Sequence, residues 1–89
     1  MLKGTTKSGF EYEVDKDAFD DMELIDALAD VNSGRNILQL STALQKIFDP
    51  DQLKRLYAHV KNDKGRVPTE PVMDIITEII SADADEKNS

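Results

Sequence analysis

Few residues in this sequence are able to carry chemistry. The chain of 89 residues contains one histidine, His59, and no cysteine. On the helix expected around it, the neighbours of His59 one turn away are Arg55 and Asp63. A metal site needs several His, Cys or carboxylate ligands that converge on one point, and these neighbours do not supply them. We therefore interpret His59 as an exposed helix-face residue and assign it no role.

Carboxylates are abundant, but their spacing matches no established site. Residues 15 to 20 begin like a calcium-binding loop, yet Phe19 stands at the fifth position and no glycine stands at the sixth. These acids suit a helix N-terminus, where negative charge meets the positive end of the helix dipole. No phosphate-binding loop, dinucleotide fingerprint or nucleophile elbow occurs. The sequence therefore predicts no catalytic, cofactor-binding or metal-binding residue, and a protein that binds others rather than an enzyme.

Length and charge restrict the partners of this chain. We place one domain at residues 1–82 and a disordered acidic tail at residues 83–89. The formal net charge of -7 argues against nucleic acid or an anionic membrane as a partner, because both require a basic surface. No apolar run reaches the roughly 18 residues of a membrane span, and the N-terminus lacks the apolar core of a signal peptide. We therefore expect a cytoplasmic protein.

The acidic residues concentrate in one segment. Residues 11 to 30 contain nine acids against Lys16, which gives -8, whereas residues 49 to 66 carry five bases against three acids, which gives +2. Two interpretations follow from this asymmetry. In the first, which we favour, a helix expected in the acidic segment is attracted within the fold to a helix expected in residues 49 to 66. In the second, the two segments mark faces for different partners.

The first fourteen residues predict a β-hairpin. Two short β-prone runs, residues 2–6 and 10–14, flank Lys7-Ser8-Gly9, where the glycine supplies a positive φ. Phe10, Tyr12 and Val14 alternate with Glu11 and Glu13, so one face of the hairpin is apolar. Two strands alone are marginally stable in water, and we expect helices to cover that face.

Four helices are predicted after the hairpin. Apolar residues at helical spacing place the first at residues 15–32 and the second at about 36–48, with Ile37 on its buried face. Asp49 and Pro50 are strong start signals for the third, and Thr69 opens a fourth that ends near Ser81. The predicted fold class is α+β: an N-terminal β-hairpin packed on a compact bundle of about four α-helices.

The fourth helix carries more apolar side chains than one buried face requires. Six large apolar residues fall within nine positions: Val72, Met73, Ile75, Ile76, Ile79 and Ile80. They either all pack inside the domain or leave a surface for another helix or for a second copy. We predict the second arrangement, a partner-binding groove lined by Met73, Ile76 and Ile80. Met22 and Leu38, which lie off the main stripes of their helices, are added to this set.

Three strings of residues carry a resemblance to a known family. The sequence resembles the short tail-assembly chaperones of siphophages and prophages of Gram-positive bacteria, and the likeness extends over roughly residues 3 to 80. The strings are KGTTKSGF at residues 3–10, DDMELIDALA at residues 20–29, and GRVPTE at residues 65–70 before the isoleucine-rich helix.

The resemblance implies a non-catalytic chaperone that works without a cofactor. Such a protein binds and solubilises the tape-measure protein until the major tail-tube protein, a second partner, polymerises around it. It implies a location in the cytoplasm of the bacterial host and absence from the mature virion, and a longer frameshifted form exists for many such proteins. Two alternatives stay open: a minor structural tail or connector protein, and an acidic inhibitor that mimics nucleic acid through residues 11 to 30.

Overall fold

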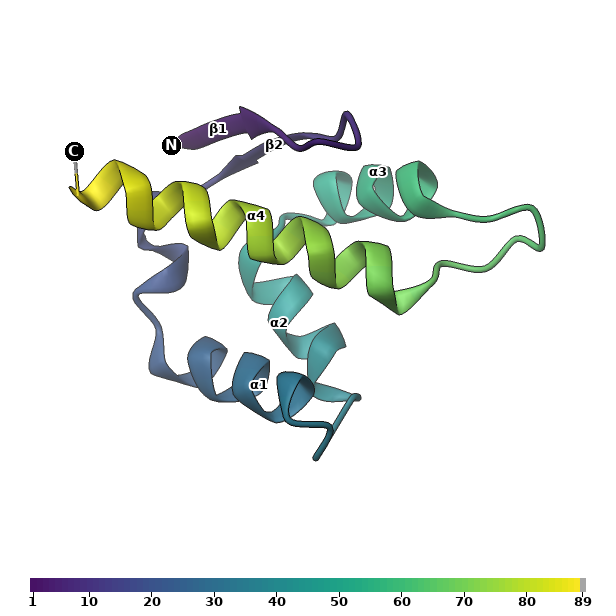
Figure 1. Ribbon diagram of the computed structural model, residues 1–89, viewed down its shortest axis with the longest axis horizontal. Coiled ribbons are helices and arrows are strands. Elements are labelled where there is room, and N and C mark those ends of the chain that lie inside the picture. Colours follow the sequence, from purple (N-terminus) through teal and green to yellow (C-terminus); the bar gives the residue numbers. More distant parts are fainter. Residues whose placement is uncertain (89) are drawn as a thin grey trace.

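The computed structural model describes residues 1–88, and the side chains of residues 1–85 (Figure 1). It confirms the predicted α+β class, in which an N-terminal antiparallel hairpin packs on four α-helices. A short 3-10 helix, Lys16–Phe19, precedes the first α-helix. The strands and α-helices are β1 (Leu2–Thr5), β2 (Glu11–Val14), α1 (Met22–Asn32), α2 (Gln39–Ile47), α3 (Pro50–Val60) and α4 (Thr69–Asn88).

The hairpin forms as its sequence predicts. Leu2 pairs with Val14 and Gly4 with Tyr12, and Gly9 adopts a φ of 93° in the connecting turn. Phe10, Tyr12 and Val14 are buried, while Glu11 and Glu13 are exposed. The apolar face of the hairpin is therefore part of the core, which supplies the cover that two strands need.

The first predicted helix, residues 15–32, is divided in the structure. Asp20 and Asp21 leave the helical region, and Asp21 becomes the N-cap of α1. Its carboxylate accepts hydrogen bonds from the backbone N–H groups of Glu23, at 2.9 Å, and Leu24, at 3.3 Å. The prediction of one continuous helix is wrong because this aspartate satisfies free N–H groups only by ending the turn that precedes it.

The start of the third predicted helix is confirmed. Asp49 is the N-cap of α3 and accepts a hydrogen bond of 2.8 Å from the backbone N–H of Gln52, while Pro50 lies in the first turn. The second helix begins later than predicted, at Gln39. Ile37 therefore lies in the turn before α2, and it is exposed rather than on a buried helix face.

The fourth helix begins at Thr69, as predicted, but continues to Asn88. The predicted end near Ser81 is therefore wrong. The helix runs past the boundary placed at residue 82 and into the segment 83–89, for which a disordered tail was predicted. No glycine or proline follows Ser81 to stop the helix, and alanine, glutamate and lysine favour its continuation. Asp83 is buried. Ser89 lies outside the described residues.

The core is mostly aliphatic and lies between the hairpin and the helices. Its largest fully buried side chains come from β2, α1, α3 and α4: Val14, Leu24, Leu56, Ile76 and Ile79. Phe10 and Phe48 meet edge to face with their ring centroids 6.2 Å apart. In Figure 1, α4 crosses the middle of the molecule, with the hairpin and α3 on one side and α1 and α2 on the other. Within the described chain, no helix is long and apolar enough to cross a membrane.

Candidate functional site

The predicted groove on α4 is not a surface in the structure. Ile76 is 2% exposed and belongs to the core, and Met73 is half-buried against the same core. Ile80 alone of the three is exposed, at 37%. The prediction is wrong for Ile76 because α4 lies centrally, so elements on more than one side cover its wide apolar face (Figure 1).

The other two predicted partner-binding residues are exposed, but the structure does not bring them together. Met22 is 65% exposed and Leu38 is 80% exposed. Met22 follows Asp21, whose carboxylate contacts Lys46 near the C-terminal end of α2. Leu38 immediately precedes the N-terminal end of the same helix. The two residues therefore mark opposite ends of α2.

An apolar hollow lies beside Leu38. Ile37, next to it in the chain, is 52% exposed. The hollow has a volume of about 320 Å³, and its lining joins the start of α2 to α3, α4 and the chain before α4. Its apolar lining residues are Ile37, Leu38, Leu40, Leu44, Tyr57, Val67 and Val72. Large exposed apolar side chains next to an apolar hollow are typical of a site that binds another protein.

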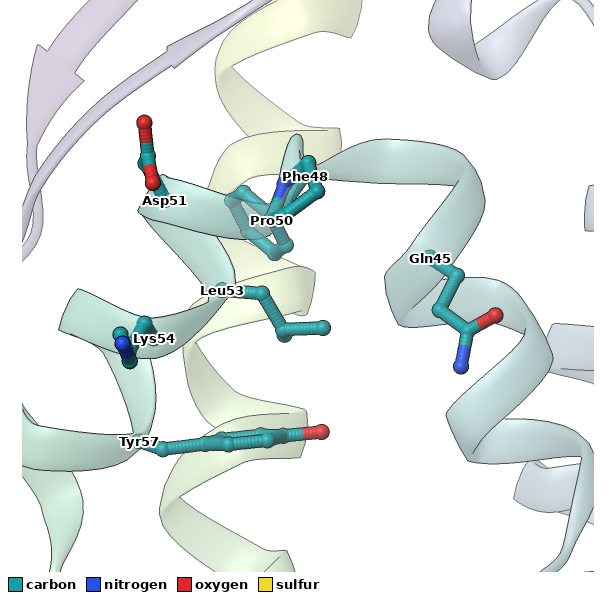
Figure 2. Close-up of a pocket in the computed structure, with 7 residues that line it drawn as sticks. All are labelled: Gln45, Phe48, Pro50, Asp51, Leu53, Lys54 and Tyr57. Atoms are coloured by element: carbon teal, nitrogen blue, oxygen red, sulfur yellow. The ribbon is translucent and has the colours of Figure 1, made fainter.

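A second hollow continues from the first. It has a volume of about 650 Å³ between α2 and α3, and Tyr57 lines both hollows. Figure 2 shows Leu53 and Tyr57 extending from α3 toward α2, where Gln45 lies opposite. Asp51 and Lys54 also line this hollow, but their side chains do not extend toward α2. We call the combined exposed area of Ile37, Leu38, Leu53 and Tyr57 the α2–α3 surface.

Sequence reasoning identified one member of this surface, Leu38, and missed the others. Leu53 and Tyr57 share the apolar stripe of α3 with Leu56, but both are only half-buried, whereas Leu56 between them is fully buried. The available signal was the polar character of that helix, in which two lysine or arginine residues and a histidine accompany the stripe. A helix this polar buries only a narrow stripe.

The acidic helix is joined to α2. Asp21 and Lys46 form an ion pair, with the carboxylate oxygen 3.1 Å from the Lys46 ammonium. This ion pair joins the acidic helix to α2 rather than to α3. It therefore does not support the favoured prediction, in which the acidic helix is attracted to α3. The hydrogen bond from Lys46, with smaller contributions from the N–H groups that Asp21 caps, holds the pKa of Asp21 below its ordinary value of 3.8.

The replacement Lys46→Met should destabilise the protein in a pH-dependent manner. A carboxylate with a lowered pKa stabilises the fold above its ordinary pKa, and this stabilisation is lost as the pH falls through the lowered value. The unfolding free energies of wild type and variant should therefore differ at neutral pH and converge in acid, as measured by urea denaturation. Lys54→Met is the matched control and should change little. A difference that persists below the pKa of Asp21 would contradict the assignment.

His59 has a structural contact that the sequence did not reveal. Its Nε2 lies 3.2 Å from Oγ of Ser8 in the hairpin turn, and its ring lies 5.6 Å from that of Phe10 between centroids. A serine bonded to a histidine also occurs in hydrolases, but Ser8 Oγ is shared with Thr6 Oγ1 at 3.0 Å, and the pair is exposed. These contacts attach the hairpin turn to α3.

The side chains that the structure describes form no group of three His, Cys, Asp or Glu residues able to hold a metal ion. Comparison of the chain with protein-family models, with curated proteins and with solved structures finds no match. The features that bear on the function are therefore the exposed α2–α3 surface and the amino-acid sequence.

Proposed function

We propose that this protein is a tail-assembly chaperone of a siphophage or prophage, which binds the tape-measure protein and keeps it soluble during tail morphogenesis. It acts in the cytoplasm of the bacterial host and leaves before the virion is complete. The resemblance of residues 3 to 80 to such chaperones supports the class of function. The α2–α3 surface supports the mode of action, which is the binding of an apolar partner.

The exposure of Leu38 is the single observation that carries this proposal. A leucine that is 80% exposed, beside an isoleucine that is 52% exposed, leaves apolar area in water that the domain itself does not cover. Burying such a side chain against a partner contributes about 2 kcal/mol. Two neighbouring side chains of this kind supply a large part of the affinity that a transient complex needs.

The chemistry of the surface suits a helical partner. The apolar stripe of a tape-measure helix would contact Leu38 and Ile37 at one end of the surface and Leu53 at the other. Tyr57 lies between them, where its ring packs on apolar groups and its hydroxyl stays at the wet rim. The net charge of -7 then favours the solubility of the complex.

The paired replacement Ile37→Asp with Leu38→Asp should weaken binding of the tape-measure protein while leaving the fold intact. Two carboxylates on this surface would have to be desolvated in the complex, so we expect at least a tenfold loss of tape-measure protein that co-purifies after co-expression. Met22→Asp adds a carboxylate at a comparably exposed apolar residue at the other end of α2, and it should bind like wild type. Circular dichroism checks that each variant is folded.

The outcomes separate the surface from the function. If the paired variant bound the tape-measure protein as well as wild type does, the α2–α3 surface would not be the binding site, but the chaperone function would still stand. If wild type did not bind the tape-measure protein, the proposed chaperone function would be wrong. Mass spectrometry of purified virions should find none of this chain, and a stoichiometric amount there would favour a structural tail or connector subunit.

A further inference from the structure

The two edges of the hairpin are treated differently by the rest of the fold. On the outer edge of β2, Gln52 forms two hydrogen bonds with Glu13: its Oε1 accepts from the backbone N–H at 2.8 Å, and its Nε2 donates to the backbone carbonyl. Arg55 donates to the carbonyl of Glu11 at 3.4 Å. Helix α3 therefore occupies the position of a third strand beside β2.

The opposite edge, along β1, has free hydrogen-bonding groups. Thr6 and Phe10 are a hydrogen-bonded pair, so the alternation of an antiparallel ladder makes Lys3 opposite Glu13 and Thr5 opposite Glu11 non-bonded pairs. The backbone groups of Lys3 and Thr5 thus point away from β2. No described group, whether a backbone group of residues 1–88 or a side chain of residues 1–85, bonds to them, and both residues are exposed. In Figure 1, β1 lies along the rim of the molecule.

We infer that the β1 edge pairs with the β1 edge of a second copy of this chain, in an antiparallel register that places Lys3 opposite Thr5 of the other copy. Strand edges with unpaired N–H and carbonyl groups accept an added strand. In this register the free groups of Lys3 and Thr5 bond to one another across a two-fold axis. Gly4 faces Gly4 of the second copy, so neither residue brings a side chain of its own to the centre, and the Tyr12 ring lies over Gly4 within each copy.

The hydrogen-bonding pattern of this edge favours a second copy as the occupant, because the free groups of Lys3 and Thr5 match those of an identical antiparallel edge. Lysine on an edge strand often prevents pairing, but here Glu13 Oε1 lies 3.8 Å from the Lys3 ammonium. In the paired sheet, the exposed face would read Glu13, Lys3, Thr5 and Glu11 from one hairpin to the other. Each lysine then lies in a row with acids, and the two lysines fall on different rows.

The pairing is short and therefore weak in free solution. A strand of four residues gives an interface well below the roughly 1,200 Å² of a stable complex, so we expect dimers at roughly 0.1 to 1 mM protein. On a long shared partner, a step that rests on the proposed function, neighbouring copies reach millimolar effective concentration. The edge would then link chaperones side by side, without the partner being needed for the pairing itself.

Disulfide trapping tests the register directly, because the chain has no cysteine of its own. The two residues of an antiparallel bonded pair lie about 5.5 Å apart between Cα atoms, within disulfide reach, whereas diagonal neighbours lie about 7 to 8 Å apart. A mixture of Lys3→Cys and Thr5→Cys proteins should form the mixed dimer under mild oxidation. Each variant alone should cross-link at least tenfold more slowly. Equal rates in all three samples would overturn the register.

Analytical ultracentrifugation of the full chain tests the edge independently. Wild type should move toward twice the monomer mass as its concentration rises to about 1 mM. Thr5→Pro removes an N–H that bonds to no group in the described part of the chain, so the hairpin should persist while dimerisation weakens at least tenfold. Thr5→Val keeps the N–H and should dimerise like wild type. A wild type that stays monomeric, or a proline variant that dimerises equally well while circular dichroism shows it folded, would overturn the proposal.

Discussion

Ile76→Ala is expected to lower the free energy of unfolding by about 3 to 4 kcal/mol, because the side chain is fully enclosed in the core and its removal leaves a cavity. A chain of this size has a total stability of roughly 4 to 13 kcal/mol. The variant should therefore unfold at a much lower urea concentration, with an unchanged slope of the transition.

Ile80→Ala is the matched control for this experiment. It removes the same atoms from the same helix one turn later, at a side chain that is 37% exposed against 2% for Ile76. Its cost should be about 1 kcal/mol or less. If both variants lost the same stability, Ile76 would not be the core residue that the structure shows. If neither lost stability, the isoleucine face of α4 would again be a candidate for partner binding.

Gln52→Ala is the second change with a large expected effect, at about 2 to 3 kcal/mol. Gln52 is 8% exposed, and its amide bonds to both backbone groups of Glu13. Alanine would leave a partly buried N–H and carbonyl without partners. Urea denaturation measures the loss. Hydrogen exchange adds a local readout, because the Glu13 amide should lose its protection before the amides of the core helices do.

Gln45→Ala provides the comparison for Gln52. Its side chain is exposed, and its amide makes only a long hydrogen bond of 3.4 Å to Ser41, one turn earlier in α2. We expect a change within about 0.5 kcal/mol. Equal stability of the two variants would mean that Gln52 does not hold the hairpin. If hydrogen exchange of the Glu13 amide were unchanged in the Gln52 variant, Gln52 would likewise not hold the hairpin.

The elements with strong local signals could be predicted from the sequence. Lys7-Ser8-Gly9 between two alternating runs determines the hairpin, and Asp49-Pro50 determines the start of α3, because these signals act within a few residues. The end of α4 could not be predicted in this way. No stop signal follows Ser81, and the burial of Asp83 depends on distant parts of the chain.

The binding surface was harder to predict for a related physical reason. Periodicity gives the width of an apolar face, but not the number of elements that cover it. The wide face of α4 is buried because the helix lies centrally, whereas Ile37 and Leu38 are exposed because α2 begins only at Gln39. A shift of about three residues in one helix boundary thus moves two large apolar side chains from the predicted helix into an exposed turn.

The contacts that hold the hairpin bear on how the chain folds as it is made. The hydrogen bond from Gln52 to Glu13 spans 39 residues, and the bond from the Lys7 backbone N–H to Glu78, at 3.0 Å, spans 71. Contacts this distant in sequence close large loops and slow the folding reaction. The hairpin, which leaves the ribosome before the helices, is therefore among the last elements to find its native partners. Until α3 has emerged, the β2 edge of the nascent hairpin stays as open to other chains as the β1 edge.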